Sequence, residues 1–94
     1  MDTQQEPGIG LQVSDVTGQK LYKASNVPPD STVGQLVKGM LGRMNLPQND
    51  ISGRPLTYHA RLEREGRHLH ASERVGDAVQ NGDKVVLQPN VDAG

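Results

Sequence analysis

Histidines are the side chains in this sequence best suited to bind a metal ion, and the chain has three: His59, His68 and His70. His68 and His70 are two positions apart, so on a strand they would share one face. Metal sites usually need three or four ligands with supporting hydrogen bonds, and nothing in the sequence places His59 beside the other two. The chain has no cysteine, which excludes thiolate catalysis and cysteine-based zinc sites. We therefore interpret the histidines as solvent-facing and expect no metal ion and no cofactor.

Arginines and glutamates interleave in the second half of the chain: Arg61, Glu63, Arg64, Glu65, Arg67, Glu73 and Arg74. A mixed run of this kind is usually a solvated face. A docking surface for an acidic patch on a partner is the alternative. No Ser–His–Asp spacing, phosphate-binding loop or carboxylate pair has a supporting context, and the chain is small. We expect that the protein is not an enzyme.

The composition excludes several classes of partner. The formal net charge is −1 and the only aromatic residues are two tyrosines, so neither charge nor base stacking favours nucleic-acid binding. No apolar run approaches the ~20 residues of a membrane span, and no signal-peptide pattern opens the chain. With 94 residues there is room for one small core. We expect a soluble, monomeric, cytoplasmic protein that contacts neither nucleic acid nor membrane.

The elements that must position these side chains are organised around one predicted helix, within residues 30–47. Asp30 or Ser31 can cap its N-terminus, and Pro47 ends it, with Asn45 just before. Apolar residues at helical spacing form one stripe: Val33, Leu36, Val37, Met40, Leu41 and Met44. Three glycines lower the helix propensity: Gly34, Gly39 and Gly42. The helix therefore needs a sheet on which to bury its stripe; whether Gly39 and Gly42 permit close packing stays open.

Four segments have the composition of strands: residues 9–13, 21–27, 56–62 and 84–88. Residues 68–70 are at most a minor strand, and residues 75–79 indicate a helical turn. The connections are a hairpin at 14–20, a loop at 48–55 and a tight turn at 81–83. Hairpin strands, a crossover helix and a returning last strand predict an α+β roll, with the helix across one face of the sheet. That is the β-grasp arrangement.

The sequence resembles the ubiquitin-like family in three places. Residues 32–36, Thr-Val-Gly-Gln-Leu, match the family's helix start, and Leu46-Pro47 matches the Ile-Pro that follows its helix. Residues 58–87 resemble the second half of the family, especially its prokaryotic members, through Leu69 and residues 75–79 and 81–87. The resemblance implies a ubiquitin-like β-grasp roll, with a mixed four- to five-stranded sheet packed on one helix. The expected domain spans residues 9–88, between a flexible lead at 1–8 and a flexible C-terminal tail at 89–94.

By this resemblance, the chain is a bacterial protein modifier. In the family, an activating enzyme adenylates the terminal carboxylate with ATP and Mg²⁺ and takes the acyl group as a thioester. A conjugating enzyme then passes it to an amine on a target protein, and a protease deconjugates it. Here the conjugated residue would be Gly94, whose missing Cβ lets an enzyme approach the carbonyl closely. Val91, Asp92 and Ala93 would contact the enzymes, although eukaryotic modifiers end in paired glycine.

Partners of the family often bind the exposed face of the sheet. The corresponding residues here are Thr57, His59, Arg61 and Val86, a more polar set than the hydrophobic patch of ubiquitin. Two other functions therefore stay open. The chain would be a non-conjugated interaction domain, like the small β-grasp components of secretion machines, or a sulfur carrier with a thiocarboxylate at Gly94. The plainest alternative is an ordinary terminus that happens to end in glycine.

Overall fold

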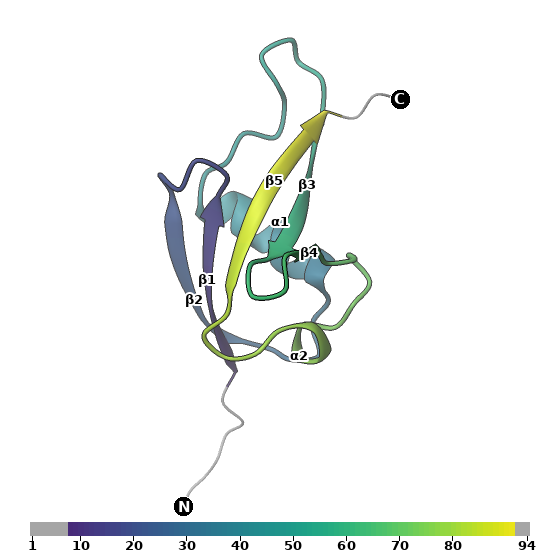
Figure 1. Cartoon of the computed structure of the whole chain (residues 1–94). Coiled ribbons are helices and arrows are strands. Elements are labelled where there is room, and N and C mark those ends of the chain that lie inside the picture. The colour runs from purple at the N-terminus through teal and green to yellow at the C-terminus, as the bar shows by residue number, and fades with distance from the viewer. Residues whose placement is uncertain (1–7, 92–94) are drawn as a thin grey trace, which may run out of the picture.

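The computed structural model describes residues 8–91, which form a five-stranded sheet with a helix across one face (Figure 1). The elements are β1 (Ile9–Asp15), β2 (Leu21–Val27), α1 (Val33–Arg43), β3 (Leu56–Leu62), β4 (Arg67–His68), α2 (Val75–Ala78) and β5 (Lys84–Val91). The strand order is β2-β1-β5-β3-β4; β1 and β5 are parallel, and the other neighbours are antiparallel. The last strand therefore lies in the middle of the sheet. The predicted α+β fold, a mixed sheet packed on one helix, is confirmed.

Helix α1 begins at a capping box formed by Thr32 and Gln35. The Thr32 hydroxyl accepts a hydrogen bond from the Gln35 N–H at 3.2 Å, and Gln35 Oε1 accepts one from the Thr32 N–H at 2.9 Å. The prediction that Asp30 or Ser31 caps the helix was wrong. The Ser31 hydroxyl instead donates to the Pro28 carbonyl at 2.6 Å, so it is used in the preceding turn.

The helix ends in a Schellman motif centred on Asn45. The Asn45 N–H donates to the Gly42 carbonyl at 3.3 Å, and the Leu46 N–H donates to the Leu41 carbonyl at 3.0 Å. Asn45 has a φ of 55°, a left-handed conformation that asparagine tolerates better than most residues. Pro47 follows two positions later, so the predicted helix end is confirmed.

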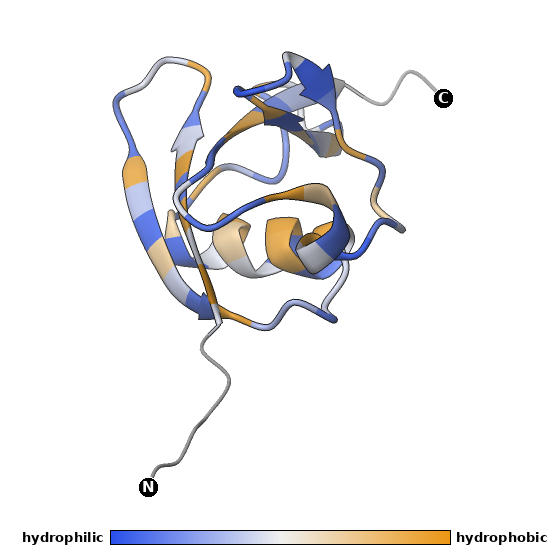
Figure 2. Ribbon diagram, turned by 60° about the horizontal axis from the view of Figure 1, so that its bottom comes forward, coloured by the Kyte–Doolittle hydropathy of each residue, from blue (hydrophilic) through white to orange (hydrophobic). Residues whose placement is uncertain are grey.

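One apolar core fills the space between α1 and the sheet. The strands carry both hydrophobic and hydrophilic residues, as Figure 2 shows. The helix and its end contribute buried Val33, Leu36, Val37, Met40, Met44 and Leu46, while Leu41 is partly buried. The sheet contributes Leu11, Val13, Ala24, Val27, Ala60, Leu62, Val85 and Leu87. The predicted stripe of the helix is therefore confirmed. No helix within residues 8–91 is long and apolar enough to cross a membrane.

Strand β5 is longer than the sequence predicted. It pairs with β3 from Leu62↔Val85 to Leu56↔Val91, so residues 89–91, expected in the tail, belong to the sheet. Pro89 made this segment look unlike a strand. Its neighbour β1 pairs with β5 only as far as Leu87, so beyond that point β5 has a free edge, where proline is tolerated. In addition, β1 continues to Asp15, and β4 ends at His68 and not at His70.

The predicted tight turn at 81–83 joins the start of β5 to the start of β1. The Gly82 N–H donates to the Gly10 carbonyl at 2.7 Å, and Asn81 Oδ1 accepts from the Gly10 N–H at 2.7 Å. Gly82 has a φ of 91°, which only glycine adopts readily. The two parallel strands are thus held in register at the end where β5 begins.

The helix glycines Gly39 and Gly42 serve no close contact within the described structure. A Cβ at either position would meet no atom within 4 Å. We expect Gly39→Ala and Gly42→Ala each to raise the free energy of unfolding by about 1 kcal/mol, because alanine is the better helix former. Urea denaturation followed by circular dichroism measures this.

Gly76→Ala is the matched control for these two variants. A Cβ at Gly76 would lie 2.8 Å from Pro29 Cβ and 3.0 Å from the Pro29 carbonyl oxygen, so this variant should lose stability. A lower free energy of unfolding for Gly42→Ala would contradict the conclusion that a Cβ at position 42 meets no neighbouring atom.

Candidate functional site

The four residues predicted on the outer face of the sheet do lie on one face. Thr57 and His59 are exposed, whereas Arg61 and Val86 are half-buried. The β3–β5 register places Arg61 opposite Val86, and directly opposed residues of an antiparallel pair share a face. The inward neighbours Ala60 and Leu62 are buried, which fixes the orientation of the strand.

A row of side chains crosses this outer face from one edge of the sheet to the other. The strand registers pair Leu21 with Ser14, Ser14 with Val86, Val86 with Arg61, and Arg61 with His68. Leu21 at one edge is 54% exposed, whereas Ser14 next to it in the row is buried. The face is therefore mixed in character, with Val86 at the centre of the row, polar Ser14 and Arg61 on either side of it, and an apolar residue at one edge.

A shallow hollow of about 290 Å³ lies between the β1–β2 connection and this face, and Val16, Arg61, Lys84 and Val86 line part of it. The Arg61 guanidinium donates to Glu63 Oε2 at 3.0 Å. Cationic and anionic side chains both contribute to the lining. The Thr17 hydroxyl, also in the lining, donates to Asp15 Oδ2 at 2.9 Å. The arrangement suits the binding of a partner's side chain by contact and charge.

The three histidines are exposed, as predicted. Antiparallel β4 brings one of them, His68, beside His59, with ring centroids 6.2 Å apart, a neighbour that the sequence had not indicated. His68 Nε2 also forms a 2.7 Å hydrogen bond with Gln88 Oε1. His70 lies beyond β4, and its backbone N–H donates to Glu73 at 2.8 Å. Within residues 8–91, histidine and carboxylate side chains form no group of three or more suited to a metal ion.

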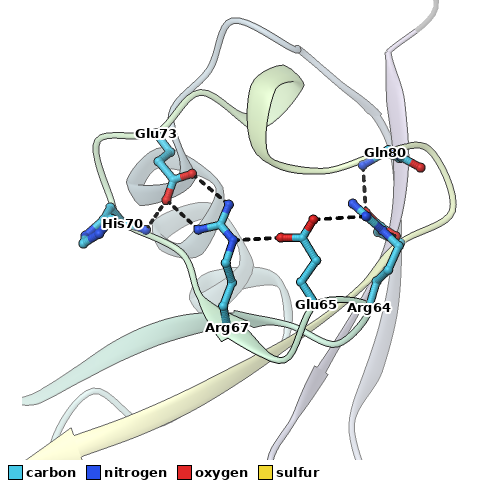
Figure 3. A network of polar contacts seen from close by, with 7 residues as sticks. Arg64, Glu65, Arg67, His70, Glu73 and Gln80 are labelled. Atoms are coloured by element: carbon cyan, nitrogen blue, oxygen red, sulfur yellow. Dashed lines mark hydrogen bonds and ion pairs between the residues drawn. The ribbon is translucent and has the colours of Figure 1, made fainter.

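The interleaved charged residues form an internal network (Figure 3). Arg64 donates to both carboxylate oxygens of Asp83, at 3.0 Å each, and also to Glu65 at 3.2 Å. Arg67 donates to Glu65 at 2.9 Å and to Glu73 at 3.2 and 3.3 Å. Arg67 thereby holds the pKa of both glutamates below the ordinary value. Much of the arginine charge is therefore compensated within the molecule, which favours the interpretation as a solvated face over a docking surface.

The end of β5 is the second part of the candidate site. Val91 is the last residue of β5 and pairs with Leu56, the first residue of β3. The Leu56 N–H donates to the Gln48 carbonyl at 2.9 Å, so the loop at residues 48–55 starts directly beside this point. Gly94, with Asp92 and Ala93, lies outside the described residues. Sequence reasoning assigned no role to this loop, and only its length and its apolar Ile51 marked it out.

Comparison with solved structures decides the fold family. The ubiquitin of Caldiarchaeum subterraneum has a TM-score of 0.60 and 25% identity, covering 92% of this chain and 98% of its own. The chain is a ubiquitin-like protein. The C-terminal ubiquitin-like domain of human 2'-5'-oligoadenylate synthetase-like protein has a TM-score of 0.64 and 19% identity, covering 99% of this chain and 95% of that one. No protein-family model and no curated protein sequence matches this ubiquitin-like protein.

A chain of an ESX-5 inner membrane complex also shares the fold, with a TM-score of 0.58 and 16% identity. The match covers 92% of the ubiquitin-like chain and 22% of that larger chain. The ubiquitin-like fold therefore also occurs as part of that larger chain.

The Asp83 carboxylate is the buried member of the charged network. Its pKa is lowered from the ordinary value of 3.8, first by the Arg64 guanidinium and further by the Gln80 N–H, against the effect of burial. Because the pKa is lower in the folded state, the ionised carboxylate stabilises the fold above pH 3.8, and this contribution is lost as the pH falls through the folded-state value.

We expect Asp83→Asn to lower the free energy of unfolding at neutral pH by about 1–3 kcal/mol, because a charged hydrogen-bonded pair is broken. The difference from the parent protein should shrink below pH 3.8. Urea denaturation across a pH series measures both effects, with the exposed Asp30→Asn as the control. A difference that stays constant from neutral to strongly acid pH would contradict the assignment.

Proposed function

We propose that this ubiquitin-like protein is a prokaryotic, cytoplasmic protein modifier that is conjugated through the carboxylate of Gly94. An activating enzyme would join that carboxylate to AMP from ATP and release pyrophosphate. A cysteine thiol of the enzyme then displaces AMP to form a thioester. The thioester passes to a conjugating enzyme, and a target amine displaces the thiol to form an amide. The modifier supplies only the acyl group, so its lack of cysteine is compatible with every step.

The observation that carries the proposal is the likeness to an archaeal ubiquitin over nearly the whole of both chains. The position of β5 supports it. This strand is paired with both neighbours from Val85 to Leu87 and then continues beside β3 alone, so it presents its C-terminal end at one edge of the molecule. The activating and conjugating enzymes supply the catalytic groups for every step, so the modifier itself needs none.

The longer β5 changes what an activating enzyme must do. With the strand ending at Val91, three residues remain up to Gly94. Three residues span at most about 11 Å when fully extended. The enzyme's active-site cleft must therefore approach the folded domain closely, and its surface must fit around the end of β5.

Mass spectrometry of cells that make the protein tests the proposal directly. Lys84 is the last basic residue, so trypsin would leave the long branch of residues 85–94 on a modified lysine. Cleavage before Asp92 would leave the short branch Asp-Ala-Gly. We expect these branches on lysines of other proteins, together with their complete loss when Gly94 is deleted. Unchanged conjugation by the deleted protein would refute the role of Gly94, and an unaltered melting temperature is the control for folding.

The second candidate is a non-conjugated interaction domain that binds through the outer face of the sheet. The fold is shared with part of a chain of an ESX-5 inner membrane complex, and this likeness supports the interaction-domain function. For this function we expect Arg61→Glu to weaken capture of partners from cells by about ten-fold or more, because reversing an interfacial charge creates repulsion. Deleting Gly94 should then have no effect, and Arg74→Glu is the matched control away from the face.

The opposite pattern separates the two functions. If Arg61→Glu leaves the captured proteins unchanged while deletion of Gly94 removes covalent adducts, the interaction-domain function is refuted. A C-terminus that gains the mass of one sulfur-for-oxygen exchange would instead identify a sulfur carrier.

A further inference from the structure

Ile51 is the most exposed large hydrophobic residue within residues 8–91. Its relative exposure is 103%, compared with 51% for Val16 and 54% for Leu21. Single apolar side chains on a surface are common and need no special explanation. Ile51 differs from such scattered residues in two ways. The rest of the domain covers none of its side chain, and hydrogen bonds fix the loop that holds it.

The loop at residues 48–55, which we name the Ile51 loop, is built around Asp50. The Asp50 carboxylate oxygen Oδ1 accepts hydrogen bonds from the Ser52 N–H at 2.9 Å and the Arg54 N–H at 2.8 Å. The Asp50 backbone donates to the Arg54 carbonyl at 2.8 Å and accepts from the Gly53 N–H at 2.9 Å. Asn49 and Pro55 form a bridge at the base. Ile51 is therefore held at the tip of an ordered turn.

Folding stability does not account for isoleucine at this tip. Turn tips favour glycine, proline and small polar residues, and a β-branched side chain gains nothing there when it buries no surface. An apolar side chain on an ordered turn is, however, well suited to binding. The loop is already arranged before contact, so little conformational entropy is lost when a partner covers the side chain.

The Ile51 loop stands at the end of the molecule where β5 ends (Figure 1). Ile51 and Leu56 are five positions apart in the chain, which limits their distance to at most about 18 Å. Leu56 lies opposite Val91. A standard protein interface of about 800 Å² per partner has a radius of about 16 Å. This radius is close to the upper limit on the distance from Leu56 to Ile51, so the interface of a protein that held the residues after Val91 can reach this loop.

We propose that the Ile51 loop is a second docking point for the enzyme that activates Gly94, with Ile51 entering an apolar pocket beside that enzyme's cleft. The inference rests on the proposed function, since the enzyme is defined by its reaction with the C-terminus. It adds that recognition depends on an apolar contact outside the tail and outside the row of side chains on the sheet face.

Formation of the enzyme thioester in extracts of the producing cells tests the inference. The purified chain is added with ATP and Mg²⁺ at a series of concentrations, and the adduct that thiol reagents release is measured on gels. We expect Ile51→Ser to raise the concentration for half-maximal adduct about ten-fold, because burial of the side chain is lost. The plateau should be unchanged, because Gly94 still reacts. Ile51→Val, which keeps most of the apolar surface, should change the half-maximal concentration less than about three-fold.

The absence of cysteine allows a second, direct measurement. Ile51→Cys gives a single thiol that can carry a benzophenone photocrosslinker, and Ser25→Cys on the exposed surface of β2 is the matched control. Light should join the label at position 51 to the same protein that forms the ATP-dependent adduct, and the label at position 25 should not do so.

The outcomes separate the two proposals. An equal half-maximal concentration for parent and Ile51→Ser, with normal adduct, overturns the docking role and leaves the modifier function intact. Crosslinking only to a second copy of the chain, or only to a protein that forms no adduct, also overturns it. If the parent chain forms no adduct at all, the modifier function fails and this inference fails with it.

Discussion

Burial of one stripe of α1 against the sheet is the interaction on which the rest of the structure depends. The helix has eleven residues and includes Gly34, Gly39 and Gly42, so it would not form alone in water. Its buried side chains pack against the inward residues of the strands, so one face of the sheet is covered by the helix. The opposite face and the strand ends are left to solvent and to partners. The candidate site lies there for that reason.

Strand β5 completes the sheet and is fixed at both ends. At its start, Asp83 pairs with Arg64 and Asn81 accepts from Gly10, which joins the strand to its neighbours on either side. At its other end, Val91 pairs with Leu56 beside the Ile51 loop. Charges that look available in the sequence are thus largely used inside the molecule. By contrast, apolar Ile51 in the loop beside the end of β5 is left exposed.

The sequence predicted what depends on local periodicity. The helix stripe and the alternation that puts Thr57, His59 and Arg61 on one face follow from repeats of 3.6 and 2.0 residues. The predicted helix start was on the wrong residue because Asp30, Ser31 and Thr32 are all short polar residues that can cap a helix. The Thr-x-x-Gln spacing of a capping box distinguishes Thr32 from the other two. What depends on pairing between distant residues could not be predicted in this way. Pro89 is tolerated because β1 stops at Asp15, His59 meets His68 because β4 folds back on β3, and Ile51 is displayed because Asp50 orders its turn.

The central place of β5 has a consequence for synthesis on the ribosome. The β1–β2 hairpin, the helix and β3 all leave the exit tunnel before the strand that lies between β1 and β3 in the finished sheet. Until β5 emerges, the inner edges of β1 and β3 have no partner, and the core is covered incompletely. Since closing such long-range pairs is the slow part of folding, native structure should appear only after β5 has left the tunnel. A ribosome stalled short of β5 would hold a chain with exposed strand edges, a natural substrate for chaperones.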